Sequence, residues 1–245
     1  MRVLALDTSS VAISVTVLRA DDEPSVWTDG RYRLTGLGAQ SGPGEMRIAP
    51  NRHGELLAPV INSALERTGT DFADLNAVAV GLGPGPFTGL RVGIVTATSI
   101  GDALAIPTYG VCSLDAIAHE HWRRGEPLAV VTDARRKQVY WRLYDGEMPI
   151  TEPDIAPPAD VAVMLQGRTS RVVGAGAELY PDAFANFEID LGTQPGDAAY
   201  PGPGAIGLLA LERVRNGAPS ELLEPLYLRR PDAKPPGAPK QVTPA

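Results

Sequence analysis

Cysteine is almost missing from this sequence, because Cys112 is the single cysteine in 245 residues. One cysteine cannot form a disulfide framework within the chain, and it excludes a zinc site built from cysteines. Long apolar runs are missing as well: none is long enough to span a membrane, and no apolar signal segment stands beside Arg2. We therefore expect a cytoplasmic protein with no membrane partner.

An excess of positive charge is also missing. The formal net charge is −7 at neutral pH, which opposes autonomous binding to the phosphate backbone of a nucleic acid. Residues 123–142 depart from this balance with six basic and two acidic side chains, and three of the basic ones stand together as Arg135-Arg136-Lys137. A solvated turn with charged tips is the simplest explanation, and a role for this run in binding stays open.

The segment from Val78 to Gly93 predicts a buried strand, a glycine–proline turn and the start of a helix. Turns of this kind often bind phosphate through backbone N–H groups and a helix N-terminus. Pro84 and Pro86 remove two such donors, and the lysine of the G-x-x-x-x-G-K-[ST] phosphate loop is missing. The turn is therefore shaped for close backbone packing more than for nucleotide capture.

Two predicted helices carry complementary faces. One spans residues 53–68, with an apolar stripe, and stops at Gly69. The other has a small residue at every fourth position from Gly89 to Ala105. Glycine inside a helix costs up to about 1 kcal/mol relative to alanine, so the stripe of small residues indicates that another element approaches closely. Tight packing within one domain and a subunit interface both explain the stripe.

The chain contains two units of the same order: a strand, an aspartate, a turn and a second strand. Residues 2–7 lead to 11–18, and residues 128–133 lead to 138–144, as a duplicated α/β architecture would. We expect a first lobe in residues 1–110, a second lobe in 111–230, and a disordered tail in 231–245, which holds five prolines. We also expect a third strand at 25–34 and a mobile loop at 35–52.

The repeat and a later strand–glycine–helix junction at 171–178 resemble the actin-like ATPase (ribonuclease H-like) fold, in which two related α/β lobes clamp a nucleotide. Four segments are similar to the TsaB (YeaZ) family, part of the bacterial machinery that makes threonylcarbamoyladenosine in tRNA. They are LALDTSS at 4–10, HGELLAPVI at 53–61, GLGPGPFTGLRVG at 81–93 and DARRKQVY at 133–140. Residues 145–230 resemble the family only loosely, and the resemblance implies that this second lobe is reduced.

The resemblance implies a non-catalytic scaffold subunit. Such a subunit pairs with a TsaD-like catalytic subunit and supports transfer of threonylcarbamoyl from its AMP adduct to the N6 amine of an adenosine beside the anticodon. It also implies a TsaE-like ATPase subunit, a homodimer, and contact with tRNA only through the complex. In the family, helices pack as a bundle between subunits, so the expected partner interface is His53, Leu56, Leu57, Val60, Ile61, Ala64, Gly89, Gly93, Ala97 and Gly101. On this interpretation, Gly93→Leu or Ala97→Trp blocks partner binding and leaves the monomer folded.

The resemblance to actin-like ATPases also implies a nucleotide site. Aspartates at the two hairpins of that fold organise a Mg²⁺–phosphate cluster, a role that falls here on Asp7 and Asp133, with Thr8 and Ser9 near the phosphates. Aspartate that simply forms a turn after a buried strand is the alternative. The scaffold role requires no cofactor, although ATP or ADP with Mg²⁺ at a complex interface stays open. An independent ATPase or small-molecule kinase is the alternative function.

The related TsaD family binds a metal through an H-x-x-x-H motif. The two histidine positions fall here on Ser113 and Ile117, neither of which supplies an imidazole. His119 and His121 are two residues apart, and on a helix they point about 200° away from each other. We therefore expect neither a metal site nor metallopeptidase activity.

Overall fold

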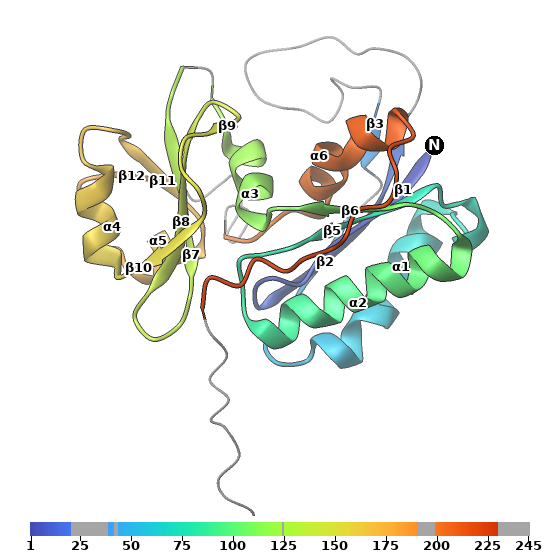
Figure 1. Ribbon diagram of the computed structural model, residues 1–245. Helices are drawn as coiled ribbons and strands as arrows, with labels where there is room; N and C mark the ends of the chain where they lie inside the picture. Colours follow the sequence, from blue (N-terminus) through green and yellow to red (C-terminus); the bar gives the residue numbers. More distant parts are fainter. Residues whose placement is uncertain (21–38, 42–43, 124, 191–198, 230–245) are drawn as a thin grey trace, which may run out of the picture.

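The computed structural model describes residues 1–20, 39–41, 44–123, 125–190 and 199–229. Two sheets of six strands stand side by side, each flanked by helices (Figure 1). The first sheet consists of β1 (Arg2–Asp7), β2 (Ala12–Ala20), β3 (Ala39–Ser41), β4 (Glu45–Ile48), β5 (Ala77–Gly81) and β6 (Thr108–Val111). The second consists of β7 (Leu128–Asp133), β8 (Val139–Asp145), β9 (Met148–Pro149), β10 (Asp154–Ala156), β11 (Arg171–Val173) and β12 (Glu188–Asp190).

The first sheet has the order β3-β2-β1-β5-β6, with β4 also paired to β2. Strand β1 is antiparallel to β2 and parallel to β5, which in turn is parallel to β6. Helices α1 (His53–Thr68) and α2 (Phe87–Leu104) cover one face, and α6 (Pro203–Arg215) covers the other (Figure 1). Because both faces are covered, β1 and β5 are apolar without alternation and are buried along nearly their whole length.

The two predicted helices form where the sequence places them. Helix α1 ends at Gly69, whose left-handed backbone (φ 56°) lets its N–H bond back to the carbonyl of Glu66. Helix α2 begins directly after Pro86 and ends at Ala105, which is also left-handed. The hairpin of β1 and β2, the strand β5 and the short strand β6 are likewise confirmed.

The second sheet repeats the connections of the first. Its order is β10-β8-β7-β11-β12, with β7 antiparallel to β8 and parallel to β11, and β11 parallel to β12. Helices α4 (Pro158–Leu165) and α5 (Ala175–Leu179) stand where α1 and α2 stand in the first lobe, with 8 and 5 residues against 16 and 18. The actin-like α/β fold with a duplicated and reduced second lobe is therefore confirmed.

Helix α3 (Ser113–His121) lies between the two sheets and packs on both α6 and β7. Helix α6 falls inside residues 111–230, yet its apolar side chains Ile206 and Leu211 pack with Val3 and Ala5 of the first sheet. A lobe boundary at 110/111 therefore places α6 with the wrong sheet. The chain crosses to the second lobe after β6 and returns to the first at residue 203.

The predicted loop at 35–52 contains two short strands, β3 and β4, which pair with β2 through backbone bonds that its irregular sequence does not reveal. The predicted strand at 25–34 and the predicted tail at 231–245 lie outside the described residues. Within the described residues, no helix is both long enough and apolar enough to cross a membrane.

Residues 219–229 form an extended segment, which we call the C-terminal strap (red in Figure 1). After α6 it follows the open edge of β6, where the N–H of Glu221 donates to the carbonyl of Thr108 at 3.0 Å. It then descends between the sheets, where the N–H of Leu226 donates to the carbonyl of Leu82 at 2.8 Å (Figure 1). The strap thus covers a strand edge and reaches the mouth of the space between the lobes.

Candidate functional site

The site begins at the turn after β1, where the carboxylate of Asp7 is buried. Its Oδ1 accepts hydrogen bonds from the Ser9 N–H at 2.8 Å and the Ser9 hydroxyl at 2.7 Å. Its Oδ2 accepts one from the Ser113 hydroxyl at 2.5 Å, and Ser113 Oγ in turn accepts the N–H of Gly83 at 3.1 Å. The first lobe, the glycine–proline turn and α3 are therefore joined through this one side chain.

Burial is the largest influence on Asp7 and raises its pKa, although the bonds from Ser113 and Ser9 lower it in part. The carboxylate faces protein on all sides and is 1% exposed. A Mg²⁺ site needs oxygens that can face the ion or its water. Asp7 does not meet that requirement. Of the two aspartates expected to organise Mg²⁺, Asp7 is therefore buried inside the fold.

The glycines of residues 81–93 let this segment pack closely on the turn of residues 7–9. A Cβ on Gly81 would lie 1.7 Å from Asp7 Oδ2, and one on Gly85 would lie 2.0 Å from the carbonyl oxygen of Ser9. A Cβ on Gly89 would lie 2.5 Å from the carbonyl oxygen of Thr8. The backbone of residues 81–89 therefore lies directly against the turn of residues 7–9, and a side chain at Gly81, Gly85 or Gly89 would not fit.

The stripe of small residues on α2 continues this packing. A Cβ on Gly93 would lie 2.3 Å from the Thr8 hydroxyl, which itself donates to the carbonyl of Gly89 at 2.8 Å. Ala97 is fully buried in the first core, and a Cβ on Gly101 would lie 2.4 Å from the Thr108 methyl group. The element that approaches the stripe is therefore the sheet of its own lobe.

The predicted interface residues of α1 are also turned inward. Leu57, Val60, Ile61 and Ala64 are each at most 2% exposed and belong to the core between α1, α2 and the sheet. Leu56 is half-buried against the same core. These residues fill the core beneath the two helices and do not lie on their outer surface. Gly93→Leu or Ala97→Trp would therefore disrupt the folded monomer, contrary to the expectation that the monomer stays folded.

His53 is the first residue of α1 and contacts the turn after β1. Its Nε2 lies 2.9 Å from the carbonyl oxygen of Ser10, in the turn after β1. The imidazole is 9% exposed. It therefore ties α1 to the turn and is largely shielded from solvent.

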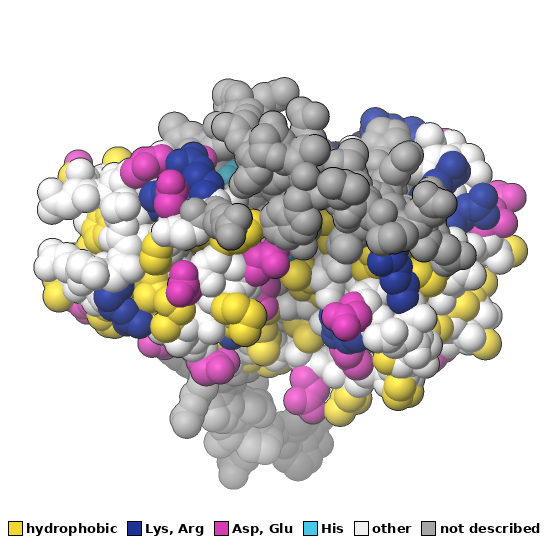
Figure 2. Space-filling model, turned by 90° about the horizontal axis from the view of Figure 1, so that it is seen from above, with side chains coloured by type: hydrophobic (Ala, Val, Ile, Leu, Met, Phe, Trp, Pro, Cys, Tyr) yellow, Lys and Arg dark blue, Asp and Glu magenta, His cyan; other side chains and the backbone are white. Residues whose placement is uncertain are grey.

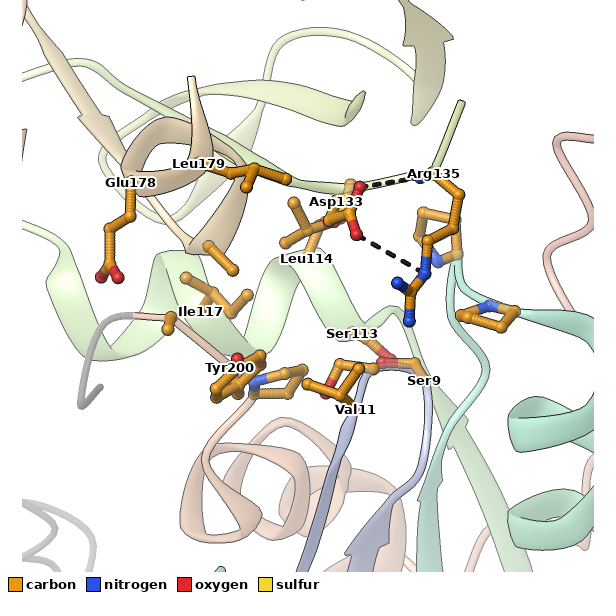
Figure 3. Close-up of a pocket in the computed structure, with 17 residues that line it drawn as sticks. Ser9, Val11, Ser113, Leu114, Ile117, Asp133, Arg135, Glu178, Leu179 and Tyr200 are labelled. Atoms are coloured by element: carbon orange, nitrogen blue, oxygen red, sulfur yellow. Dashed lines mark hydrogen bonds and ion pairs between the residues drawn. The ribbon is translucent and has the colours of Figure 1, made fainter. Parts of the chain in front are cut away.

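A cavity of about 360 Å³ opens between the lobes. Its floor is made by Ser9–Val11 and by the first turn of α3, and its opposite wall by the end of β7 and by α5 (Figure 3). Residues 199–201 close one side, where burial, followed by the charges of Glu178 and Asp133, raises the pKa of Tyr200. The volume of the cavity suits a small molecule. Its lining includes serine hydroxyl groups and both acidic and basic side chains, which suit a ligand with polar groups.

Asp133 lies at this cavity, unlike Asp7. Its Oδ1 accepts the N–H of Arg135 at 2.8 Å, and its Oδ2 is 3.6 Å from Arg135 Nε (Figure 3). Of the four residues expected at phosphates, Ser9 and Asp133 line the cavity, whereas Asp7 and Thr8 lie beneath its floor. The sequence missed Glu178 and Tyr200, because only the folded chain brings these distant residues to one wall.

The residues at the two positions of the metal motif have other contacts. Ser113 holds Asp7, and Ile117 is buried against Leu128 and Val130 of the second sheet. His119 Nδ1 lies 3.4 Å from a carboxylate oxygen of Glu147, and His121 Nδ1 lies 3.8 Å from one of Asp190. Over the ranges that the structure describes, no group of three His, Cys, Asp or Glu residues is placed to hold a metal ion.

Comparison with known proteins gives consistent matches. Residues 47–235 match the family described as "TsaD: tRNA N6-adenosine threonylcarbamoyltransferase". An uncharacterised protein of Mycobacterium tuberculosis (strain ATCC 25618 / H37Rv) is 39% identical over 233 residues, 95% of this chain and 94% of that protein. The tRNA threonylcarbamoyladenosine biosynthesis protein TsaB of Escherichia coli (strain K12) is 31% identical over 242 residues, 94% of this chain and 95% of that protein.

A solved structure, YeaZ from Pseudomonas aeruginosa, has the same fold. It superposes with a TM-score of 0.67 at 27% sequence identity, covering 93% of this chain and 100% of that one. The match therefore includes the second lobe, where the sequence motifs are few.

Proposed function

The chain belongs to the TsaB (YeaZ) family, and from this we propose that it is a non-catalytic scaffold subunit in the formation of threonylcarbamoyladenosine in tRNA. Its partner in this role is a TsaD-like catalytic subunit, and a TsaE-like ATPase joins the assembly. The chain pairs with itself when the catalytic subunit is absent. The complex works in the cytoplasm and meets tRNA as an assembly.

The sealed state of Asp7 is the observation that carries the non-catalytic role. Both of its carboxylate oxygens accept hydrogen bonds from protein donors, and a Cβ on Gly81 would overlap one of them. Ser113 and Ile117 hold the fold together at the positions where the metal motif of the TsaD family falls. The chain therefore uses the central residues of the fold for structure and leaves catalysis to its partner.

The outer face of α1 and α2 is the surface that we assign to the catalytic subunit. Since the inner faces fill the core, contact falls on exposed positions such as Ala58 and Asn62 of α1 and Val95 and Ser99 of α2. Val95 is a large apolar side chain with 61% exposure in the middle of α2. The side chains at these positions are small or of medium size, which suits close packing of two helices against two more.

Light scattering after size-exclusion chromatography tests this assignment. We expect the chain and the TsaD-like protein of the same organism to form a one-to-one complex, and Val95→Glu to abolish it. Val163→Glu is the matched control, because Val163 is 66% exposed on α4 of the other lobe. Loss of the complex with both variants, or with neither, would rule out this face as the interface.

The cavity between the lobes favours a second candidate, an ATPase or small-molecule kinase. Asp133 and Arg135 stand at its wall with Ser9 opposite, so ATP or ADP with Mg²⁺ would draw on these residues and not on Asp7. Isothermal titration of the chain and of its complex with MgADP tests this. Heat that disappears in Asp133→Asn and ATP turnover by the isolated chain would favour the enzyme, whereas binding only in the complex would favour the scaffold.

A further inference from the structure

The C-terminal strap begins with several bonds to the first lobe. The Thr108 N–H donates to Ser220 Oγ at 3.1 Å, and the carboxylate of Glu221 accepts the N–H of Gly110 at 3.0 Å. The same carboxylate pairs with Arg213 of α6 at 2.7 Å. All of these bonds are made to the edge of β6 or to α6, so the first part of the strap is fixed to the first lobe.

The end of the strap reaches the start of α2. The N–H of Leu226 donates to the carbonyl of Leu82, and Tyr227 stacks on Phe87 with ring centroids 4.8 Å apart. The Arg91 guanidinium lies over the Phe87 ring, 3.8 Å from its centroid. Tyr227 is 38% exposed, so the stack lies at the surface and can open while the core stays folded.

The last described residue of the strap contacts the second lobe. Arg229 Nη2 donates to the side-chain oxygen of Gln138, in the basic turn between β7 and β8. Burial raises the pKa of the Tyr140 phenol, and the charge of Arg229 lowers it in part, which also places Arg229 near the start of β8. The strap therefore begins on the edge of one sheet and ends against the other sheet.

The end of the strap joins the two walls of the cavity. Leu82 precedes the glycine–proline turn, two prolines of which line the cavity from the first lobe. Gln138 lies in the turn that follows Asp133 and includes Arg135, and these two residues line the cavity from the second lobe. Helix α3 packs on both lobes and forms part of the cavity floor. The strap thus connects, at the mouth of this space, the two walls that α3 connects at its base.

The charges on the face shown in Figure 2 do not suggest another link between the lobes. Both ends of the molecule carry Lys and Arg side chains beside Asp and Glu side chains, so neither end presents charge of one sign. Mixed charges of this kind give little net attraction between two bodies, and salt screens it within about 10 Å. The separation of the lobes at the cavity mouth therefore depends on specific contacts such as those of the strap.

We propose that residues 226–229 form a latch that holds the two lobes at a fixed separation, and that release of this latch widens the cavity between them. The latch is held by a backbone bond, a partly exposed ring stack and a side-chain bond across the lobes. A segment with such contacts opens at a lower free-energy cost than the core unfolds. Because the first part of the strap stays on β6, the released latch remains tethered and closes again. The latch acts within this chain and does not depend on the catalytic subunit.

Pulsed electron–electron double resonance on the full chain measures the separation of the lobes. Spin labels are attached at Glu212→Cys on α6 and Arg168→Cys after α4, both exposed positions, with Cys112→Ser to remove the native thiol. Labelled chain is diluted with unlabelled chain, so that only distances within one chain are measured. We expect a narrow distance distribution for this parent and a broader one, shifted to longer distances, for Tyr227→Ala with Arg229→Ala.

Two further variants make the test specific. Arg229→Ala alone removes the contact with the second lobe and leaves the first lobe intact, so it should give part of the shift. Leu222→Ala is the matched control, because Leu222 lies in the same strap and is 83% exposed. We expect it to keep the distribution of the parent. An unchanged distribution in the double variant, or equal broadening with Leu222→Ala, would overturn the proposal.

Hydrogen exchange followed by mass spectrometry locates the change in the chain. Residues 226–229 should exchange faster in the double variant, whereas β6 should exchange as it does in the parent. Faster exchange throughout the first lobe would mean that the strap stabilises that lobe as a whole. That result would contradict a latch between the lobes.

Discussion

At the scale of single residues, the structure is organised around the turn of residues 7–9. Glycines 81, 85, 89 and 93 each leave room for an atom of Asp7, Thr8 or Ser9, and the residues between them build the turn and the first helical turns of α2. The sequence predicted close packing from the glycine spacing. It could not show which element approaches, because the turn is about 80 residues away along the chain.

The contact between Gly93 and Thr8 can be measured directly. Gly93→Ala should lower the free energy of unfolding by about 1–3 kcal/mol, because its Cβ would lie 2.3 Å from the Thr8 hydroxyl. Thr8→Ala should cost about 1 kcal/mol through its lost bond to Gly89. In the double variant the clash is gone, so the two costs should not add. Strict additivity in urea unfolding would show that the two residues do not touch.

Asp7 gives a pH-dependent prediction. Its pKa in the folded chain is above the ordinary value of 3.8, mainly because of burial. The folded state then holds the proton more tightly than the unfolded state, so the contribution of this carboxyl to stability is present below pH 3.8 and is lost as the pH rises through the folded pKa. Asp7→Asn cannot lose a proton.

Unfolding free energies of the wild type and Asp7→Asn, measured from acidic to neutral pH, check this linkage. As the pH rises from 3.8 through the folded pKa of Asp7, the stability of Asp7→Asn relative to the wild type should increase. Curves that stay parallel would mean that the pKa of Asp7 is the same in the folded and unfolded chains.

At the scale of elements, periodicity was a reliable guide wherever a helix or strand has one face in the core. Helices α1 and α2 and the two aspartate hairpins lie where the sequence predicts them. The apolar stripe of α1 and the small-residue stripe of α2 were interpreted as a partner interface. Such a stripe indicates that a helix face is buried, but it does not identify the element that packs on that face. The C-terminal strap was missed because its irregular bonds to β6 and Leu82 impose no periodicity.

The strap should contribute measurably to stability through Tyr227. Tyr227→Ala removes the stack on Phe87, and we expect a loss of about 1 kcal/mol, the usual value of an aromatic pair beyond its buried area. Tyr227→Phe keeps the ring and serves as the control. If thermal unfolding shows the same loss for both variants, the ring contact does not anchor the strap.

At the scale of the whole molecule, two lobes of one topology have diverged. The first has the long helices α1 and α2, and the start of α2 packs closely on the turn of residues 7–9. The second has short helices α4 and α5 and supplies the wall of the cavity and the basic turn. The sequence predicted this duplication from two strand–aspartate units. It did not predict the return of α6 to the first sheet, because an apolar helix fits either lobe.

We propose that this chain is a required but non-catalytic partner in tRNA modification. The most direct measurement is threonylcarbamoyladenosine formation on tRNA by the TsaD-like subunit, with a TsaE-like ATPase present, with and without this chain. We expect activity only when the chain is added, loss of activity with Val95→Glu, and full activity with Val163→Glu. Modification at the full rate without the chain, or by the chain alone, would contradict the claim.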